Sequence, residues 1–398
     1  NQYGIAVAQS TGIEKGNAEK GVAAMIILCE GRTFIAGADI SEFGKPPREP
    51  YLTDLCQLIE DSPKPVIAAI HGTALGGGLE IPLSSHFRIA AAGAKVGFPE
   101  VKLGLLPGAG GTQRLPRLTG VQAALEMITS GTPIAAARAK SMGILDEVVD
   151  GDLKSAALAL AKKVIAEKIP IRRVGQLQAK IDSPAVFEDF AKSISGKFRN
   201  FIAPFKCIEA VKAATELPFA EGIKLERAMF RELMATDQSK AQRHAFFAER
   251  EAVRVPGLPA DQPTREIKSV GVLGAGTMGV GIAMCFANAG IPVTMLDMKQ
   301  EFIDKGMAAI RKHYAGTVAK GRLTQEAMAR RMSLIRPTLA YEDLKNTDLV
   351  IEAVFEDIAI KKEVFAKLDA VCKPGAILAT NTSYLNVNDI AAATQRPQ

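Results

Sequence analysis

The chain has 398 residues, a formal net charge of +6 and an average composition, with 47% hydrophobic and 23% charged residues. These values are typical of a globular protein with two or three domains, and they exclude a disordered or collagen-like chain. The longest apolar run, residues 21–29, is far shorter than the ~20 residues that a transmembrane helix needs, so we expect no membrane span. Lysine and arginine do not cluster with aromatic residues, so we expect no nucleic-acid partner.

The five cysteines are scattered along the chain without a CxxC pair, which favours free thiols in a reducing compartment. Because the sequence also shows no targeting signal, we expect a cytoplasmic protein. The four histidines are equally dispersed, so we expect no metal site. The small basic excess fits either an ordinary solvated surface or an anionic ligand.

Apolar runs alternate with helical patterns in the first part of the chain. Residues 22–28 and 65–72 are continuous apolar runs and are predicted as buried strands. Residues 155–167 have helical periodicity, and residues 221–254 are predicted as long charged helices. The chain begins at Asn1 rather than Met, so we expect the natural protein to begin further upstream.

Three segments of this region place glycines or small residues beside an acid or an apolar strand: RTFIAGADI (32–40), HGTALGGGLE (71–80) and GFPEVKLGLLPGAGGTQRLPR (97–117). Glu80 and Glu100 each stand before apolar residues, and burial there would raise their pKa values toward the range used in proton transfer. The alternative for either residue is an ordinary surface acid at a helix start or a turn. Taken singly, each acid leaves both interpretations open.

Residues 256–266 interrupt the helical pattern with three prolines, a glycine and several polar residues. Such a composition is typical of a linker between domains. We therefore expect an α/β protein with two domains, residues 1–255 and residues 267–398.

The second domain opens with a strand, the pattern Gly274-x-Gly276-x-x-Gly279, a helix and a second strand that ends in Asp297. Gly274 permits a tight turn, Gly276 lets a pyrophosphate approach the backbone, and Gly279 lets the helix pack on the strand. Asp297 is placed to accept hydrogen bonds from both ribose hydroxyls, and its charge would repel a 2′-phosphate, which favours NAD over NADP. The alternative is a tight strand–helix turn without a ligand.

Two further buried strands are predicted at 347–357 and 376–385, and the second ends in Asn381-Thr382-Ser383. Polar residues at the ends of strands are where a doubly wound sheet presents groups to a ligand. The same residues would serve equally well as helix caps.

The sequences GAGTMG, VIEAVFEDIAIKKEVF and ATNTS together resemble the NAD domain of 3-hydroxyacyl-CoA dehydrogenases. The resemblance implies that Met278 and Asp297 line the cofactor. It also implies that Glu356 and Lys361 lie near the nicotinamide-side ribose and the substrate, and that Ser383 orients the substrate hydroxyl. The family's catalytic histidine follows the N-T-S strand, whereas all four histidines here precede it. We therefore expect a domain truncated before the catalytic histidine, which binds NAD without oxidising a substrate.

The sequences AGADI, ALGGGLE and PGAGGTQRL resemble the crotonase (enoyl-CoA hydratase/isomerase) superfamily, whose members fold as a spiral of ββα units. The resemblance implies an oxyanion hole formed by the N–H groups of Ala36 and Gly77, with Glu80 and Glu100 as the catalytic acids. The residues that it assigns to substrate or coenzyme A binding are Gly37, Ala38, Asp39, Ile40 and Gly108.

The resemblance implies that Glu80 takes a proton from water and that Glu100 gives a proton to C2 of a trans-2-enoyl-CoA. Enoyl-CoA isomerisation through Glu100 is the expected side activity. A hydratase followed by a dehydrogenase resembles the multifunctional fatty-acid β-oxidation enzymes of bacteria and peroxisomes, which implies an acyl-CoA substrate and a thiolase subunit as partner. With the cysteine usage and the lack of a targeting signal, we expect a bacterial cytoplasmic protein, with the peroxisome as the alternative. The alternatives are a non-catalytic RNA-binding relative, against which both retained glutamates argue, and a misassembled hydratase.

Overall fold

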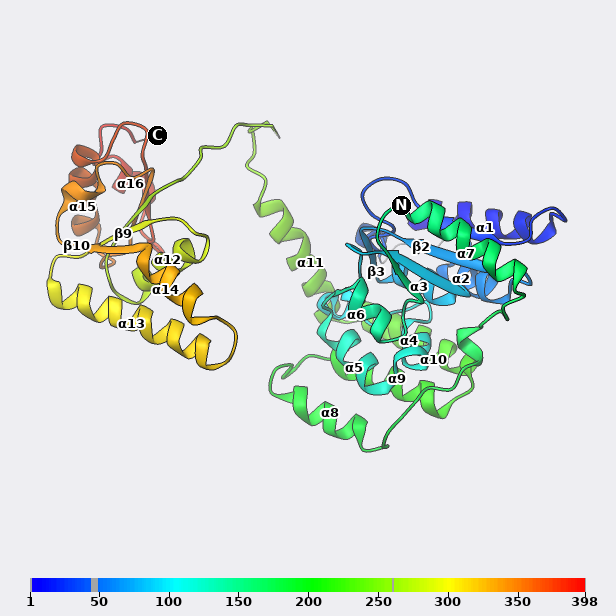
Figure 1. Cartoon of the computed structure of the whole chain (residues 1–398). Coiled ribbons are helices and arrows are strands. Elements are labelled where there is room, and N and C mark those ends of the chain that lie inside the picture. The colour runs from blue at the N-terminus through cyan, green and yellow to red at the C-terminus, as the bar shows by residue number, and fades with distance from the viewer. Residues whose placement is uncertain (1, 44–48, 260, 398) are drawn as a thin grey trace. The chain divides into compact units, whose positions relative to one another are not determined.

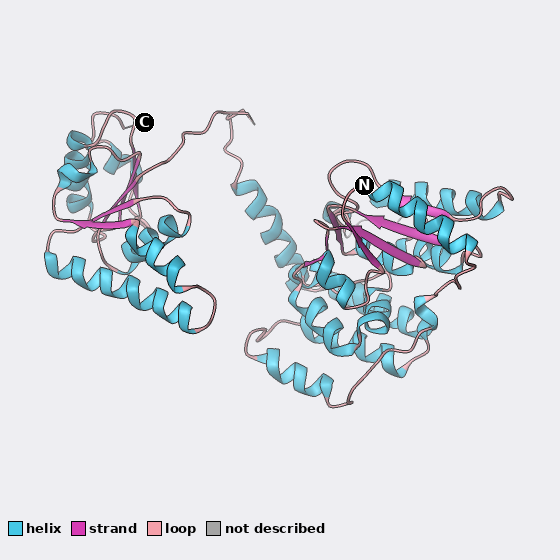
Figure 2. Cartoon of the chain, in the orientation of Figure 1, coloured by secondary structure: helices cyan, strands magenta, loops and turns pink. Residues whose placement is uncertain are grey.

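The computed structural model describes residues 2–43, 49–259 and 261–397. The chain divides into two compact units, residues 1–257 and residues 258–398, which Figure 1 colours along the chain. The division lies inside the predicted linker 256–266, of which residue 260 is outside the described residues. Both units combine helices with parallel strands (Figure 2).

A four-stranded parallel sheet with the strand order β1-β2-β4-β7 forms the centre of the first unit. Its strands are β1 (Met25–Leu28), β2 (Val66–Ile70), β4 (Phe87–Ala91) and β7 (Glu147–Val149). All residues of β2 are apolar and buried, as expected for a parallel strand that is covered on both faces. The predicted strands at 22–28 and 65–72 are confirmed by β1 and β2.

A second sheet, with the order β3-β5-β6, brings the glycine-rich segments together. Its strands are β3 (Thr73–Leu75), β5 (Lys95–Gly97) and β6 (Ile134–Ala135). Ile35 bridges to Ala74, and the N–H of Gly76 donates to the carbonyl oxygen of Gly97 at 2.9 Å. The three glycine-rich segments of the sequence therefore lie side by side, although they are far apart in the chain.

Helices surround these sheets (Figure 1). They are α1 (Gln2–Ala18), α2 (Leu52–Asp61), α3 (Gly77–Ser84), α4 (Gly111–Thr119), α5 (Val121–Ser130), α6 (Ala136–Ser141), α7 (Leu153–Ala166), α8 (Val186–Ser195), α9 (Ala203–Glu216), α10 (Phe219–Ala235) and α11 (Asp237–Ala252). Short 3₁₀ helices lie at η1 (Ile40–Glu42), η2 (Pro99–Leu103) and η3 (Val174–Gln176). The helices predicted at 155–167 and 221–254 are confirmed by α7 and by α10 with α11.

A buried ion pair ties α2 to α4. The Nη2 atom of Arg114 lies 2.7 Å from Oε2 of Glu60, and both side chains are almost fully shielded from solvent. The other carboxylate oxygen of Glu60 accepts a hydrogen bond from the N–H of Gly175 in η3. Because both oxygens of this carboxylate have partners, the ion pair fixes three elements on one side of the core.

The second unit contains a five-stranded parallel sheet with the order β10-β9-β8-β11-β12. Its strands are β8 (Val270–Leu273), β9 (Val293–Leu296), β10 (Ile335–Thr338), β11 (Leu349–Glu352) and β12 (Ile377–Thr380). The chain order reverses between β8 and β11, as in a doubly wound nucleotide-binding sheet. The strand predicted at 347–357 is shorter in the structure, where β11 ends at Glu352. The chain leaves the strand direction there, because the N–H of Val354 donates a hydrogen bond to the carboxylate of Glu352.

Helices cover both faces of this sheet. They are α12 (Thr277–Asn288), α13 (Gln300–Ala319), α14 (Gln325–Ser333), α15 (Ile358–Val371) and α16 (Val387–Ala391), with the 3₁₀ helix η4 (Tyr341–Leu344). One apolar cluster joins α12 and α13 to β8 and β9, and a separate cluster joins α15 to β11. The doubly wound architecture predicted for this domain is therefore confirmed.

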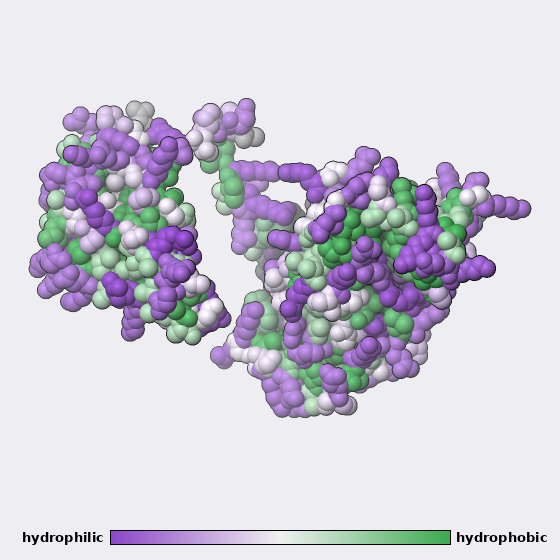
Figure 3. All heavy atoms as spheres, in the orientation of Figure 1, coloured by the Kyte–Doolittle hydropathy of each residue, from purple (hydrophilic) through white to green (hydrophobic). Residues whose placement is uncertain are grey.

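The surface of both units is mainly hydrophilic in the view of Figure 3, with apolar residues scattered between polar ones. Within the part of the chain that the structure describes, no helix combines the length and the apolar character that crossing a membrane requires. The five cysteines are all free thiols, of which Cys56, Cys207 and Cys372 are buried.

We expect Glu60→Gln to lower the free energy of unfolding of the first unit by about 3–5 kcal/mol, because it leaves the guanidinium of Arg114 buried without a counter-charge. The matched control is Glu188→Gln, which removes an exposed ion pair with Lys192 and should cost no more than about 1 kcal/mol. Hydrogen exchange of the β2 amides measures both changes, since these amides exchange when the core opens. Equal loss of protection in the two variants would contradict the role of the buried pair.

Candidate functional site

A cavity of about 520 Å³ lies in the first unit where the glycine-rich segments meet α3, η2 and α10. It brings together most of the site residues predicted for this domain. Those that line it are Ala36, Gly37, Ala38, Ile40, Gly77, Glu80, Glu100 and Gly108. Asp39 lies between lining residues, and its carboxylate accepts a hydrogen bond from the N–H of Ser41 at the start of η1.

The residues Ala36 and Gly77 line this cavity, and their backbone N–H groups donate to no acceptor among the described residues. Ala36 follows the bridge residue Ile35, and Gly77 is the first residue of α3. The first N–H groups of a helix lack intrahelical partners, and the helix dipole adds a partial positive charge there. Both groups can therefore donate to an oxygen atom inside the cavity.

The glycine triplet is required by close contacts on either side of Gly77. Gly76 has a φ of 55°, and a Cβ atom there would lie 2.5 Å from Oε1 of Glu100. A Cβ atom on Gly78 would overlap the carbonyl oxygen of Ile35. The triplet thus lets α3 begin directly against the neighbouring segment and leaves room for the Glu100 carboxyl group.

Glu80 is buried in the first turn of α3. Its Oε1 atom accepts hydrogen bonds from the N–H groups of Ala109 at 2.7 Å and Gly111 at 2.8 Å. Burial raises the pKa of Glu80 to about 7, although these two hydrogen bonds favour the ionised form. Near neutral pH this carboxyl group can therefore both accept and release a proton.

Glu100 lies in η2, on the other side of the same cavity. Its Oε2 atom is shielded from solvent and has no hydrogen-bond partner among the described residues. Burial, reinforced by the charge of Glu80, raises the pKa of Glu100 well above its usual value. Two carboxyl groups with different environments thus face one space, as in acid–base pairs.

A third buried carboxylate, Glu226 of α10, was not predicted from the sequence. It accepts hydrogen bonds from the N–H groups of Gly110 at 2.6 Å and Thr112 at 2.9 Å. Burial, followed by the charge of Glu80, raises its pKa to about 8. A sequence signal existed: Glu226 shares the apolar face of α10 with Gly222, Met229 and Leu233, at helical spacing.

The second unit has a cavity of about 650 Å³ at the carboxyl ends of β8, β9 and β11. Gly274, Gly276, Met278 and Asp297 line it, as predicted. Gly274 has a φ of 108°, and no atom lies within 4 Å of a Cβ atom placed on Gly276. A Cβ atom on Gly279 would overlap the carbonyl oxygen of Gly274, so this glycine packs α12 against the turn itself. The glycine-rich backbone therefore lies open to a ligand.

Asp297 holds this turn in place. Its Oδ2 atom accepts a hydrogen bond from the N–H of Ala275 at 2.7 Å, and Oδ1 accepts from the N–H of Met298 at 2.7 Å. The acid predicted to bind ribose is therefore already hydrogen-bonded to the glycine-rich turn. It still lines the cavity, where its carboxylate can accept further hydrogen bonds.

Glu356, Lys361 and Ser383 form a separate cluster and do not line this cavity. The buried ammonium of Lys361 contacts Glu352 at 2.7 Å and Glu356 at 3.2 Å. Hydrogen bonds from Thr382 and from the N–H of Ser383, together with Lys361, lower the pKa of Glu356 to about 2. The sequence analysis missed Glu352, the fully buried partner in this cluster.

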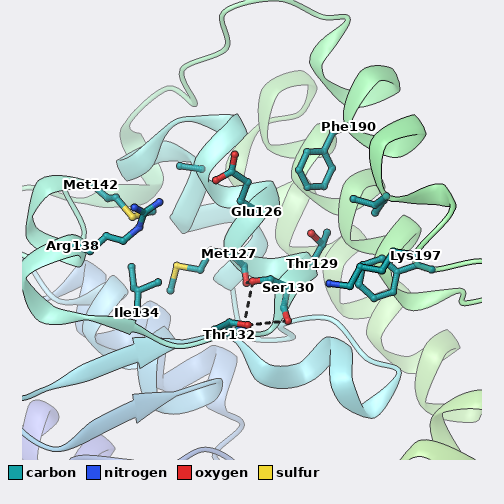
Figure 4. A pocket seen from close by; sticks show the side chains of 13 residues that line it. Glu126, Met127, Thr129, Ser130, Thr132, Ile134, Arg138, Met142, Phe190 and Lys197 are labelled. Carbon is teal, nitrogen blue, oxygen red and sulfur yellow. Dashed lines mark hydrogen bonds between the residues drawn. The ribbon is translucent and has the colours of Figure 1, made fainter. Parts of the chain in front are cut away.

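A smaller cavity of about 340 Å³ lies between α5, α6 and α8 (Figure 4). Apolar side chains such as Met127 and Phe190 line it, with Glu126, Arg138 and Lys197. No residue predicted for either site lines this cavity. It therefore lies apart from the candidate functional sites.

Comparison with known proteins matches both units. Residues 10–207 match the family described as enoyl-CoA hydratase/isomerase, and residues 269–398 match the family described as 3-hydroxyacyl-CoA dehydrogenase, NAD binding domain. The peroxisomal bifunctional enzymes of Danio rerio and Homo sapiens are 40% and 42% identical to this chain, over 98% and 97% of it and 54% of each relative. The fatty acid oxidation complex subunit alpha of Pseudomonas paraeruginosa is 37% identical, over 96% of this chain and 56% of the relative.

The chain spans about half the length of the curated relatives it matches. The parallel four-stranded and five-stranded sheets and the two family matches confirm the predicted fold class. The first unit therefore belongs to the enoyl-CoA hydratase/isomerase (crotonase) family, and the second unit belongs to the NAD-binding domains of 3-hydroxyacyl-CoA dehydrogenases.

Proposed function

We propose that the first unit adds water to trans-2-enoyl-CoA thioesters and forms 3-hydroxyacyl-CoA. One observation carries this proposal: a single cavity combines two free N–H groups with two buried carboxyl groups. The N–H groups of Ala36 and Gly77 provide an oxyanion hole, and Glu80 and Glu100 provide the base and the acid. The family match supports this assignment.

The oxyanion hole addresses the charge that develops on the thioester carbonyl oxygen. When water attacks C3, the electron pair of the double bond moves onto this oxygen as an enolate. Donors from Ala36 and Gly77 stabilise the enolate more than the neutral carbonyl, and the loss of one such donor typically costs ~3 kcal/mol. The positive end of the α3 dipole acts in the same direction.

The two carboxyl groups move the protons of the reaction. Glu80, in its ionised form, takes one proton from the attacking water while the water oxygen bonds to C3. Glu100, protonated, gives its proton to C2 as the enolate collapses. The raised pKa values of both residues suit these opposite roles near neutral pH. A proton exchange between the two groups through water restores the starting state.

The segment 37–40 lies at the same cavity, with Arg227 and Arg231 of α10. We propose that backbone groups of Ala38 and Ile40 hold the adenine of coenzyme A, as in the family that this segment resembles. A Cβ atom on Gly108 would collide with the ring of Phe230, and we propose that this glycine lies near the reacting carbons, as the resemblance implies. Enoyl-CoA isomerisation is the second candidate activity, because the unpartnered Oε2 atom of Glu100 can shuttle a proton alone.

We infer that the second unit binds NAD in the cavity at the glycine-rich turn. The open space above Gly276 fits a pyrophosphate, the start of α12 supplies N–H groups, and Asp297 offers acceptors to the ribose. Bound there, the nicotinamide ring would accept a hydride. The cluster of Glu356, Lys361 and Ser383 would stand beside the substrate, and oxidation of 3-hydroxyacyl-CoA is proposed for the full-length protein.

The domain limits 1–255 and 267–398 stay predictions, as does a thiolase partner. The relatives are named for peroxisomes and for a bacterial complex, which supports a role in fatty-acid β-oxidation. The bacterial cytoplasm and the peroxisome therefore both stay predictions for this chain.

Glu80→Gln and Glu100→Gln should each lower kcat for hydration of crotonoyl-CoA by about 10²–10⁴-fold, because each removes one proton-transfer group. The loss of the absorbance of the conjugated thioester measures the rate. The control Glu126→Gln, in the separate cavity of Figure 4, should leave the rate unchanged. Wild-type rates in both site variants would refute the hydratase assignment.

The pH dependence of kcat/KM should be bell-shaped. The rate should rise with pH through about 7, because Glu80 must lose its proton to act as a base. It should fall at higher pH, as Glu100 loses the proton that it donates, and Glu100→Gln should abolish this alkaline limb. An acidic limb near ~4.3, the pKa of an ordinary glutamate, would contradict the assignment of the base.

Asp297→Asn should raise the dissociation constant for NAD by about tenfold or more, because hydrogen bonds to a charged acceptor contribute about 1.5–3 kcal/mol. It should also reduce the preference for NAD over NADP. The control is Asp304→Asn, an exposed residue of α13 that hydrogen-bonds Gln300. Isothermal titration calorimetry measures both, and an unchanged affinity in Asp297→Asn would count against the proposed site.

A further inference from the structure

The start of α4 is held by two carboxylates from opposite sides. Glu80 accepts hydrogen bonds from the N–H groups of residues 109 and 111, whereas Glu226 accepts from those of residues 110 and 112. Successive N–H groups of this turn therefore point alternately to α3 and to α10. A displacement of either carboxylate would change the direction of the N–H groups that serve the other.

A hydrogen-bond network connects Glu226 to α9. The hydroxyl of Thr112 also donates to Glu226, and it accepts a hydrogen bond from Nε2 of Gln113 at 3.0 Å. The same Nε2 atom donates to the carbonyl oxygen of Ala210 at 2.8 Å. Gly222, one helical turn before Glu226, has no side chain because a Cβ atom there would overlap Gln113. Glu226 thus fixes the turn rigidly with respect to two helices.

We propose that Glu226 is a positioning residue for Glu80. Its carboxyl oxygens set the turn 109–112 so that two N–H groups meet Oε1 of Glu80 and hold the base toward the cavity. This inference rests on the proposed hydration reaction, in which Glu80 is the base. Glu226 does not line the cavity and therefore acts through the turn.

The surroundings of Glu226 show why a carboxylate stands there. The ionisable groups that face it from other elements are Glu80 of α3, Glu100 of η2, Arg114 of α4 and Cys207 of α9. Both Gly110 and Thr112 present N–H donors, and a carboxylate offers acceptors to both. A glutamine would place an NH₂ group against one of these donors.

The test compares steady-state rates of crotonoyl-CoA hydration for the wild type, Glu226→Gln and a matched control. The control is Glu232→Gln, an exposed acid on the same helix. Glu226→Gln should lower kcat at least tenfold with KM changed less than twofold, because substrate contacts stay in place. Glu232→Gln should behave like the wild type. If Glu226→Gln fails to fold, Thr112→Val removes one of its hydrogen bonds and should lower kcat in the same way.

A double-mutant cycle separates positioning from general stability. In the Glu80→Gln background, Glu226→Gln should lower the residual kcat by less than twofold, because the base it positions is already absent. The inference would be overturned if Glu226→Gln lowered kcat by the same factor in the wild-type and Glu80→Gln backgrounds. A wild-type kcat in both Glu226→Gln and Thr112→Val would also overturn it. Absence of hydration by the wild type would instead refute the proposed function.

Discussion

The first unit depends on one electrostatic constraint: carboxylates are buried against the N–H groups of a single helix start. Removing a carboxylate from water is unfavourable unless hydrogen bonds and a helix dipole compensate for the lost solvation. The turn before α4 supplies four such N–H groups to Glu80 and Glu226. The compensation is partial, so the pKa values stay raised and the acids titrate near neutral pH. The rest of the unit, including the buried Glu60–Arg114 pair, holds this arrangement in place.

The second unit also buries charged side chains, and it compensates for their lost solvation with ion pairs and hydrogen bonds. Its buried lysine, Lys361, is neutralised by Glu352 and Glu356, and the hydroxyls of Thr380 and Thr382 donate hydrogen bonds to these two carboxylates. This cluster stiffens the ends of β11 and β12 next to the glycine-rich turn. The turn itself is held by Asp297 through Ala275, which leaves its open side to a ligand. Rigid strand ends and an exposed backbone are the features that a dinucleotide site requires.

Several strands and the glycine-rich segments could be predicted from the sequence, because they depend mainly on residues that are neighbours in the chain. Apolar runs gave β1, β2 and β8, and the glycines beside Glu80 marked a close backbone approach. Glu226 was missed although it shares the apolar face of α10, because its hydrogen-bond partners Gly110 and Thr112 lie 116 and 114 residues away in the sequence. Glu352 was missed because the sequence does not show that this acid is fully buried. The prediction that Glu356 and Lys361 lie near the cofactor is untested, although the structure shows that they contact each other. Side-chain networks of this kind depend on tertiary packing, which periodicity alone does not specify.

The central claim is that burial keeps Glu100 protonated while Glu80 can ionise. Infrared difference spectroscopy at neutral pH tests this most directly, because protonated carboxyl groups and carboxylates absorb at separate frequencies. Subtracting the spectrum of Glu100→Gln from that of the wild type should reveal a protonated carboxyl band that belongs to Glu100. A carboxylate band in that difference spectrum would show that Glu100 is ionised at neutral pH and would contradict the account.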